Sequence, residues 1–131
     1  MKFNNDWPSF VCLGDRKTAK ITESVQVVAT VVHDHDTTPA DFDCYGENEV
    51  RRWEDDEWDF VGIVLTLEVN GQEVATLGSL WGIERNLTAE HSYFSECAND
   101  LIDPDQIRDE LEKLAAALAE AIAAIDTLAT T

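Results

Sequence analysis

A chain of 131 residues is long enough for one hydrophobic core and too short for two of ordinary size, so we expect one domain over residues 1–131. Its 44% hydrophobic content excludes the apolar-poor class of disordered acidic chains, and its formal net charge of -18 argues against direct binding to nucleic acid. Three widely spaced cysteines, no signal-peptide pattern and no apolar run of membrane length predict a cytoplasmic protein that neither enters membranes nor depends on disulfides.

The first half of the chain predicts one long strand, a loop and a short helix. Residues 1–18 show little periodicity, and we expect an irregular segment there. Residues 21–32 are rich in β-branched side chains that alternate with polar ones, which is typical of a strand. Residues 33–46 follow as a loop, and residues 47–57 predict a short, highly charged helix.

A β-hairpin is the clearest local signal in the sequence. Residues 58–69 and 72–83 are two apolar runs separated by Asn70-Gly71. This dipeptide suits a two-residue turn that requires positive φ at both positions. Together with residues 21–32, the hairpin predicts an antiparallel sheet of at least three strands, with an apolar face that needs covering.

Two C-terminal helices are predicted to provide that cover. The first follows a cap at Thr88 or Ser92, and the second, residues 104–128, begins after Asp103 with Pro104 in its first turn. A stripe on the second helix has spacings of three and four residues, which describes either packing on the sheet, which we favour, or a helix-mediated dimer. The stripe consists of Ile107, Leu111, Leu114, Leu118, Ile122, Ile125 and Leu128. The predicted fold is therefore α+β, a sheet with a central Asn-Gly hairpin covered by two C-terminal helices.

The negative charge is concentrated in two blocks. Residues 34–59 carry eleven acidic residues against two arginines, and residues 84–126 carry eleven against three basic residues. Such blocks repel polyanions and attract basic surfaces, including grooves built to bind phosphates. The alternatives are a solvated face that keeps the protein soluble and an adaptation to high salt.

One cluster of side chains could hold a metal ion, and no group of residues predicts catalysis. His33, Asp34, His35 and Asp36, with Asp41, Asp43 and Cys44 nearby, could supply imidazole and carboxylate ligands, although their spacing matches no established zinc or calcium loop. His91 and Cys97 lie too far apart on the predicted helix to act together. Phosphate-binding and dinucleotide-binding loops are also lacking, so neither an enzyme nor a cofactor is expected.

Three tryptophans flank the hairpin and its entry helix. Trp53, Trp58 and Trp81, with Phe60, are expected to be buried. The alternative is that one of them is exposed beside the acidic residues and serves as an interface anchor.

Two motifs in this region carry a resemblance. The segments 53–64, WEDDEWDFVGIV, and 78–84, GSLWGIE, resemble those of small, functionally unassigned proteins of phages and plasmids, particularly of actinobacteria. The resemblance covers about residues 25–102 and brings no active site with it. It implies a mobile-element setting, in which small acidic proteins block host defence systems.

These observations lead to one main hypothesis and two alternatives. We expect a non-enzymatic acidic binding protein that mimics nucleic-acid charge and occupies a basic groove of a host defence or DNA-binding protein, as an inhibitor of the anti-CRISPR or anti-restriction type. The alternatives are a metal-binding protein or metal-dependent enzyme using His33 and His35, and an assembly protein that dimerises through its C-terminal helix. The expected partner-binding residues are Glu54, Asp55, Asp56, Glu57, Asp59, Asp105, Asp109 and Glu112.

Overall fold

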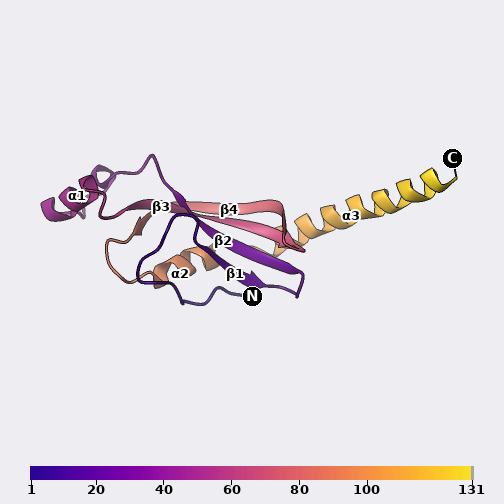
Figure 1. Cartoon of the computed structure of the whole chain (residues 1–131), viewed down its shortest axis with the longest axis horizontal. Coiled ribbons are helices and arrows are strands. Elements are labelled where there is room, and N and C mark those ends of the chain that lie inside the picture. Colours follow the sequence, from indigo (N-terminus) through magenta and orange to yellow (C-terminus); the bar gives the residue numbers. More distant parts are fainter. Residues whose placement is uncertain (131) are drawn as a thin grey trace.

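A computed structural model describes residues 1–130 and confirms the predicted α+β class (Figure 1). Four strands form one sheet, and three α-helices and one 3-10 helix accompany it. In chain order the elements are β1 (Arg16–Lys20), β2 (Val25–His33), η1 (Pro39–Asp41), α1 (Glu47–Glu54), β3 (Asp59–Val69), β4 (Gln72–Arg85), α2 (Ser92–Asp100) and α3 (Pro104–Ala129).

The sheet is an antiparallel meander in the order β1-β2-β3-β4. The predicted hairpin is confirmed: Val69 pairs with Gln72 across Asn70 and Gly71, which have φ values of 52° and 79°. Positive φ at both turn positions matches the right-handed twist of the flanking strands. Register shifts along β3 and β4 mark irregularities that bend the hairpin.

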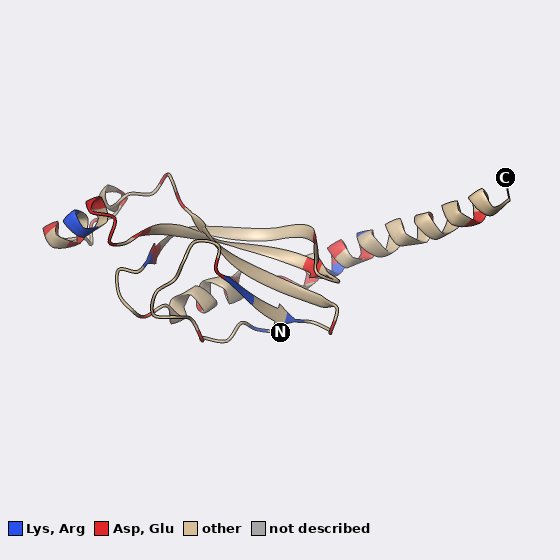
Figure 2. Cartoon of the chain, in the orientation of Figure 1, with Lys and Arg blue, Asp and Glu red and all other residues tan. Residues whose placement is uncertain are grey.

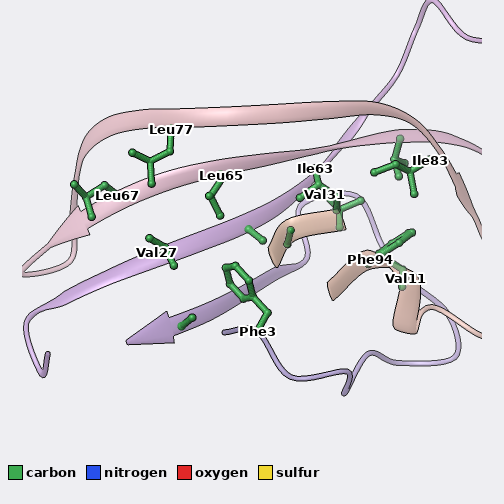
Figure 3. Packing of buried hydrophobic residues seen from close by; sticks show 14 of the residues in the cluster. Phe3, Val11, Val27, Val31, Ile63, Leu65, Leu67, Leu77, Ile83 and Phe94 are labelled. Carbon is green, nitrogen blue, oxygen red and sulfur yellow. The ribbon is translucent and has the colours of Figure 1, made fainter. Parts of the chain in front are cut away.

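The core lies on one face of the sheet. Alternate residues of β2 and β3 point to this face, where α2 covers them through Phe94 and Ala98 (Figure 3). The N-terminal segment closes the other side of α2, because Phe3 and Val11 are also part of the core. A single layer of helix on one sheet face is therefore the main source of hydrophobic stabilisation.

The N-terminal segment is more ordered than its sequence indicates. Asn99 on α2 accepts a hydrogen bond from the Phe3 amide at 2.8 Å and donates one to its carbonyl at 3.2 Å. Asn86 makes the same pair of bonds with Val11, at 2.9 and 3.0 Å. These side-chain amides replace strand partners along a segment without regular structure. The edge strand β1, which follows it, was not predicted, since its five residues are mostly polar and exposed.

Helix α3 begins as predicted but is only partly packed. Asp103 accepts hydrogen bonds from the amides of Asp105 and Gln106, and Pro104 occupies the first turn. Ile107 is buried in the core, whereas Leu118 and Ile125 are 56% and 63% exposed. The prediction of core packing is therefore wrong for the second half of the stripe, because the helix extends past the end of the sheet into solvent (Figure 1).

Candidate functional site

The acidic residues around α1 form a lobe at one end of the sheet, which we call the acidic lobe (residues 47–57; Figures 1 and 2). Its only basic residues are Arg51 and Arg52. Arg51 donates a hydrogen bond to Asn48 at 2.9 Å, and Arg52 lies 3.7 Å from a Glu57 carboxylate oxygen. Within residues 1–130, the carboxylates of Glu54, Asp55 and Asp56 have no ion-pair partner. The lobe thus presents exposed negative charge that its own cations do not balance.

Aromatic side chains anchor this lobe to the sheet. Trp58 is 2% exposed and donates a hydrogen bond from its indole nitrogen to the Glu49 carbonyl at 2.9 Å. Its ring centroid lies 5.2 Å from that of Tyr45, whose hydroxyl donates to the Glu84 carboxylate on β4. Burial and this contact raise the pKa of Tyr45 well above its usual value, so the hydroxyl remains protonated. The lobe is therefore held on a rigid base.

A hollow of about 300 Å³ lies at the same end of the sheet as this lobe, where His33 at the end of β2 pairs with Val61, and we call it the histidine–tryptophan hollow. Its lining residues are His33, Asp34, His35, Asp36, Thr37 and Trp81. A series of ring contacts runs from the hollow towards the lobe. Phe42 lies near Gly82, the neighbour of Trp81, and its ring centroid is 5.9 Å from that of Tyr45, which in turn contacts Trp58. The hollow and the acidic lobe therefore belong to the same end of the molecule.

Trp81 forms an exposed aromatic wall of this hollow. Trp81 is 50% exposed, whereas Trp58 and Phe60 are buried as expected. The ring lies against Gly62 so closely that a Cβ atom there would be 2.3 Å from a ring carbon. Its indole nitrogen donates to the Ser79 hydroxyl at 3.1 Å. Gly62 in the interior of β3 is thus the feature that lets the ring lie on the sheet.

Asp34 shapes the floor of the hollow as a structural residue. Its buried carboxylate accepts hydrogen bonds from the amides of Asp36, Thr37 and Gly82 and from the Thr37 hydroxyl, at 2.6 to 3.2 Å. Burial raises the pKa of Asp34, but these hydrogen bonds outweigh it and bring the pKa below its usual value. The charged carboxylate therefore ties the loop after β2 to β4.

His33 and His35 lie in contact but do not form a metal site with other side chains of residues 1–130. Their rings contact edge to face at a centroid distance of 4.3 Å. His33 Nδ1 is 3.5 Å from an Asp59 oxygen, but Asp59 is held by two hydrogen bonds from Arg85, at 2.7 and 2.8 Å. Asp34 is committed to its own turn. Across residues 1–130, no three His, Cys, Asp or Glu side chains are placed to hold a metal ion together.

The predicted partner-binding residues separate into three locations. Glu54, Asp55, Asp56 and Glu57 are exposed on the acidic lobe, while Asp59 is half-buried in its pair with Arg85. Asp105, Asp109 and Glu112 are exposed on α3, at the opposite end of the sheet (Figure 2). One compact basic groove cannot contact both acidic blocks, because the sheet lies between them.

His91 and Cys97 are structural in this arrangement. His91 is 2% exposed, and its Nε2 accepts a hydrogen bond from the Asn86 amide at 3.1 Å. Burial lowers the pKa of His91, so the ring is neutral, and burial raises the pKa of the Cys97 thiol. A thiol that stays protonated and an imidazole whose Nε2 already accepts a hydrogen bond from a backbone amide do not form a nucleophile and base.

No family model, curated protein or solved structure matches this chain. The helices within residues 1–130 do not include one with the length and apolarity needed to cross a membrane. The candidate site consequently depends on its own geometry and charge.

Proposed function

We propose that this chain is a non-enzymatic, cytoplasmic binding protein that takes a basic protein segment at the end formed by the acidic lobe and the histidine–tryptophan hollow. One observation carries the proposal: half-exposed Trp81 walls a hollow at the same end of the sheet as a lobe in which Glu54, Asp55 and Asp56 lack cation partners. Interfaces of stable complexes combine a central aromatic anchor with a polar rim. The same end of the molecule offers both.

An arginine side chain is the ligand that this end suits best. Its guanidinium group can stack on a tryptophan face and can also bind carboxylates through two parallel hydrogen bonds. Exposed ion pairs contribute only about 0.2–1 kcal/mol each, so several carboxylates of the lobe must act together to guide the encounter and hold the segment. The indole of Trp81 and the walls of the hollow would anchor the segment through contacts that salt does not screen.

The partner class we favour is a nucleic-acid-binding protein. Grooves that bind phosphates are rich in arginine and lysine, and a chain with a net charge of -18 competes for them while repelling the nucleic acid itself. Occupying such a groove would inhibit the partner, as expected for a mobile-element inhibitor of the anti-CRISPR or anti-restriction type. The acidic lobe, rather than α3, would enter the groove, since it alone adjoins an aromatic anchor.

Matched charge reversals test which acidic block binds. Replacing Glu54, Asp55 and Glu57 with lysine changes the net charge by six units on the lobe, and replacing Asp109, Glu112 and Glu120 does so on α3. Asp56 is left unchanged, because its φ of 60° would strain a lysine. Binding to basic proteins captured from a host lysate on heparin is then measured for both variants.

We expect the lobe variant to lose binding at least about tenfold and the α3 variant to retain most of it. Double-stranded DNA added to the captured proteins should compete with the parent chain. Equal losses in both variants would indicate a response to total charge, and retention in both would move the interface away from carboxylates.

A further inference from the structure

The exposed half of α3 is an apolar surface that the fold leaves uncovered. Leu118, Ile122, Ile125 and Leu128 are 56% to 72% exposed, and they continue the stripe that begins with buried Ile107. Isolated helices in water derive little stability from propensity and depend on packing of their apolar face. A helix that projects with such a stripe is typical of one that binds another helix.

The same helix borders an apolar groove at its base. The groove has a volume of about 430 Å³ and lies between the first turns of α3 and the pair Met1 and Ile21. Ile107 and Leu111 belong both to the groove and to the stripe. Groove and stripe therefore form one continuous surface, which runs from the sheet to the last turn of α3.

We propose that a second copy of this chain covers this surface, and that the two α3 helices pack antiparallel, with the tip of each helix in the groove of the other. Apart from Ile122, whose core position is taken by Ala121, the stripe fits a heptad repeat. Leu111, Leu118 and Ile125 lie at one core position and Ile107, Leu114, Ala121 and Leu128 at the other. From Ile107 to Leu128 this repeat spans three heptads, or about 32 Å of helix, the minimum length that supports a coiled coil.

The contact area of the two helices alone is smaller than that of a stable complex, which favours an arrangement in which the tip of the second copy's α3 also contacts the groove. Two helices in contact over about 32 Å, each about 10 Å wide, cover roughly 320 Å² of one another. Stable complexes cover about 800 Å² on each partner. A tip seated between Met1, Ile21 and the base of α3 extends the contact beyond the helix pair at both ends. A two-fold axis generates both such contacts from one surface.

Charge decides the orientation. Parallel helices would bring two sheets, each part of a chain with a net charge of -18, to the same end of the dimer, whereas antiparallel helices hold them apart on opposite ends. Along α3 itself the charge favours neither orientation, because Arg108 and Lys113 are paired with Asp105 and Glu110 of the same helix. The separation of the two acidic sheet ends therefore favours the antiparallel arrangement.

Sedimentation of the full chain tests the dimer. We expect a dimer for the parent protein and a monomer for the double variant Leu118→Asp and Ile125→Asp. The matched control, Ala116→Asp and Ala123→Asp, adds the same charge on the opposite face of α3 and should remain dimeric. Near-ultraviolet circular dichroism checks that the sheet is intact in both. A parent chain that is monomeric at every concentration, or a dimer that the stripe variant retains, would overturn the proposal.

Spin labels test the orientation. Cys12 and Cys44, which are exposed, are replaced with serine, and one label is attached at Glu120→Cys or Lys113→Cys. If Leu114 faces Ile125 of the second copy, the two labels at 120 lie at nearly the same height and those at 113 lie about 20 Å apart along the axis. Equal, short separations at both positions would mean parallel helices and would overturn the antiparallel arrangement. These tests do not involve the basic partner, so the dimer can fail independently of the proposed function.

Discussion

At the scale of single residues, the candidate site depends on side chains that its backbone admits or holds in place. Gly62 admits the Trp81 ring, and Asp34 fixes the loop that carries His35. His91 and Asn86 secure the segment after β4 by a hydrogen bond between ring and amide. These residues make no proposed contact with a partner, yet each determines where the exposed groups lie.

Gly62→Ala should displace Trp81 and weaken partner binding. A Cβ atom 2.3 Å from the ring forces the indole to move, at a cost of about 1–3 kcal/mol in the free energy of unfolding. Gly78→Ala is the matched control in the same hairpin, because its Cβ would lie 3.6 Å from Leu101, an ordinary contact. Urea unfolding and partner binding are measured for both. Normal binding by the Gly62 variant would remove Trp81 from the proposed interface.

His91 should make the fold less stable in mild acid. Its pKa in the folded chain is lowered by burial, so the unfolded chain binds a proton first as the pH falls through about 6.5, the unperturbed value. Between that pH and the lower folded pKa, the unfolded state holds more protons, and the free energy of unfolding decreases as pH falls. Replacing His91 with Gln should flatten this dependence in urea unfolding measured at pH values from 7.5 to 5.5. An unchanged slope would contradict the assignment.

At the scale of elements, local patterns determined what could be predicted. Asn70-Gly71 identified the hairpin and Asp103-Pro104 the start of α3, because turns and caps depend on a few adjacent residues. Strand β1 was missed because an exposed edge strand is held by backbone hydrogen bonds to β2, which leave little trace in side-chain pattern. Whether Leu118 packs on the sheet depends on where the sheet ends relative to α3. That position is a property of the tertiary structure, and the residues around Leu118 do not indicate it.

The site was predictable in part for the same reason. The exposed carboxylates of Glu54 and Asp55 follow from charge density alone. Asp59 has the same residue type but pairs with Arg85 across the hairpin, a contact set by strand register. The pairing of Trp81 with Gly62 likewise joins two strands. A strand glycine is a weak sign of close approach, and it could have drawn attention to this position.

At the scale of the whole molecule, the two proposed associations use opposite ends of the sheet and different forces. The acidic lobe would bind by charge with an aromatic anchor, and α3 would bind a second copy through apolar contacts. An antiparallel dimer would place the two acidic lobes at its far ends, away from the helix pair (Figure 2). Such a molecule could engage two basic segments at once, provided that they lie far enough apart.

Salt should therefore weaken partner binding and should not weaken the dimer. Exposed charges interact over about 10 Å in 0.1 M salt and about 3 Å in 1 M salt, so raising the concentration between these values should weaken partner binding about tenfold or more. The dimer loses no comparable attraction, and screening reduces the repulsion between two chains that each carry a net charge of -18. Its dissociation constant should stay constant or fall over the same range.

Sedimentation measures the dimer, and titration of the captured basic partner measures the other association. A dimer that dissociates at high salt would mean that charge, rather than the apolar stripe of α3, holds the two copies together. Partner binding that resists salt would mean that the affinity comes from Trp81 and its hollow rather than from the carboxylates.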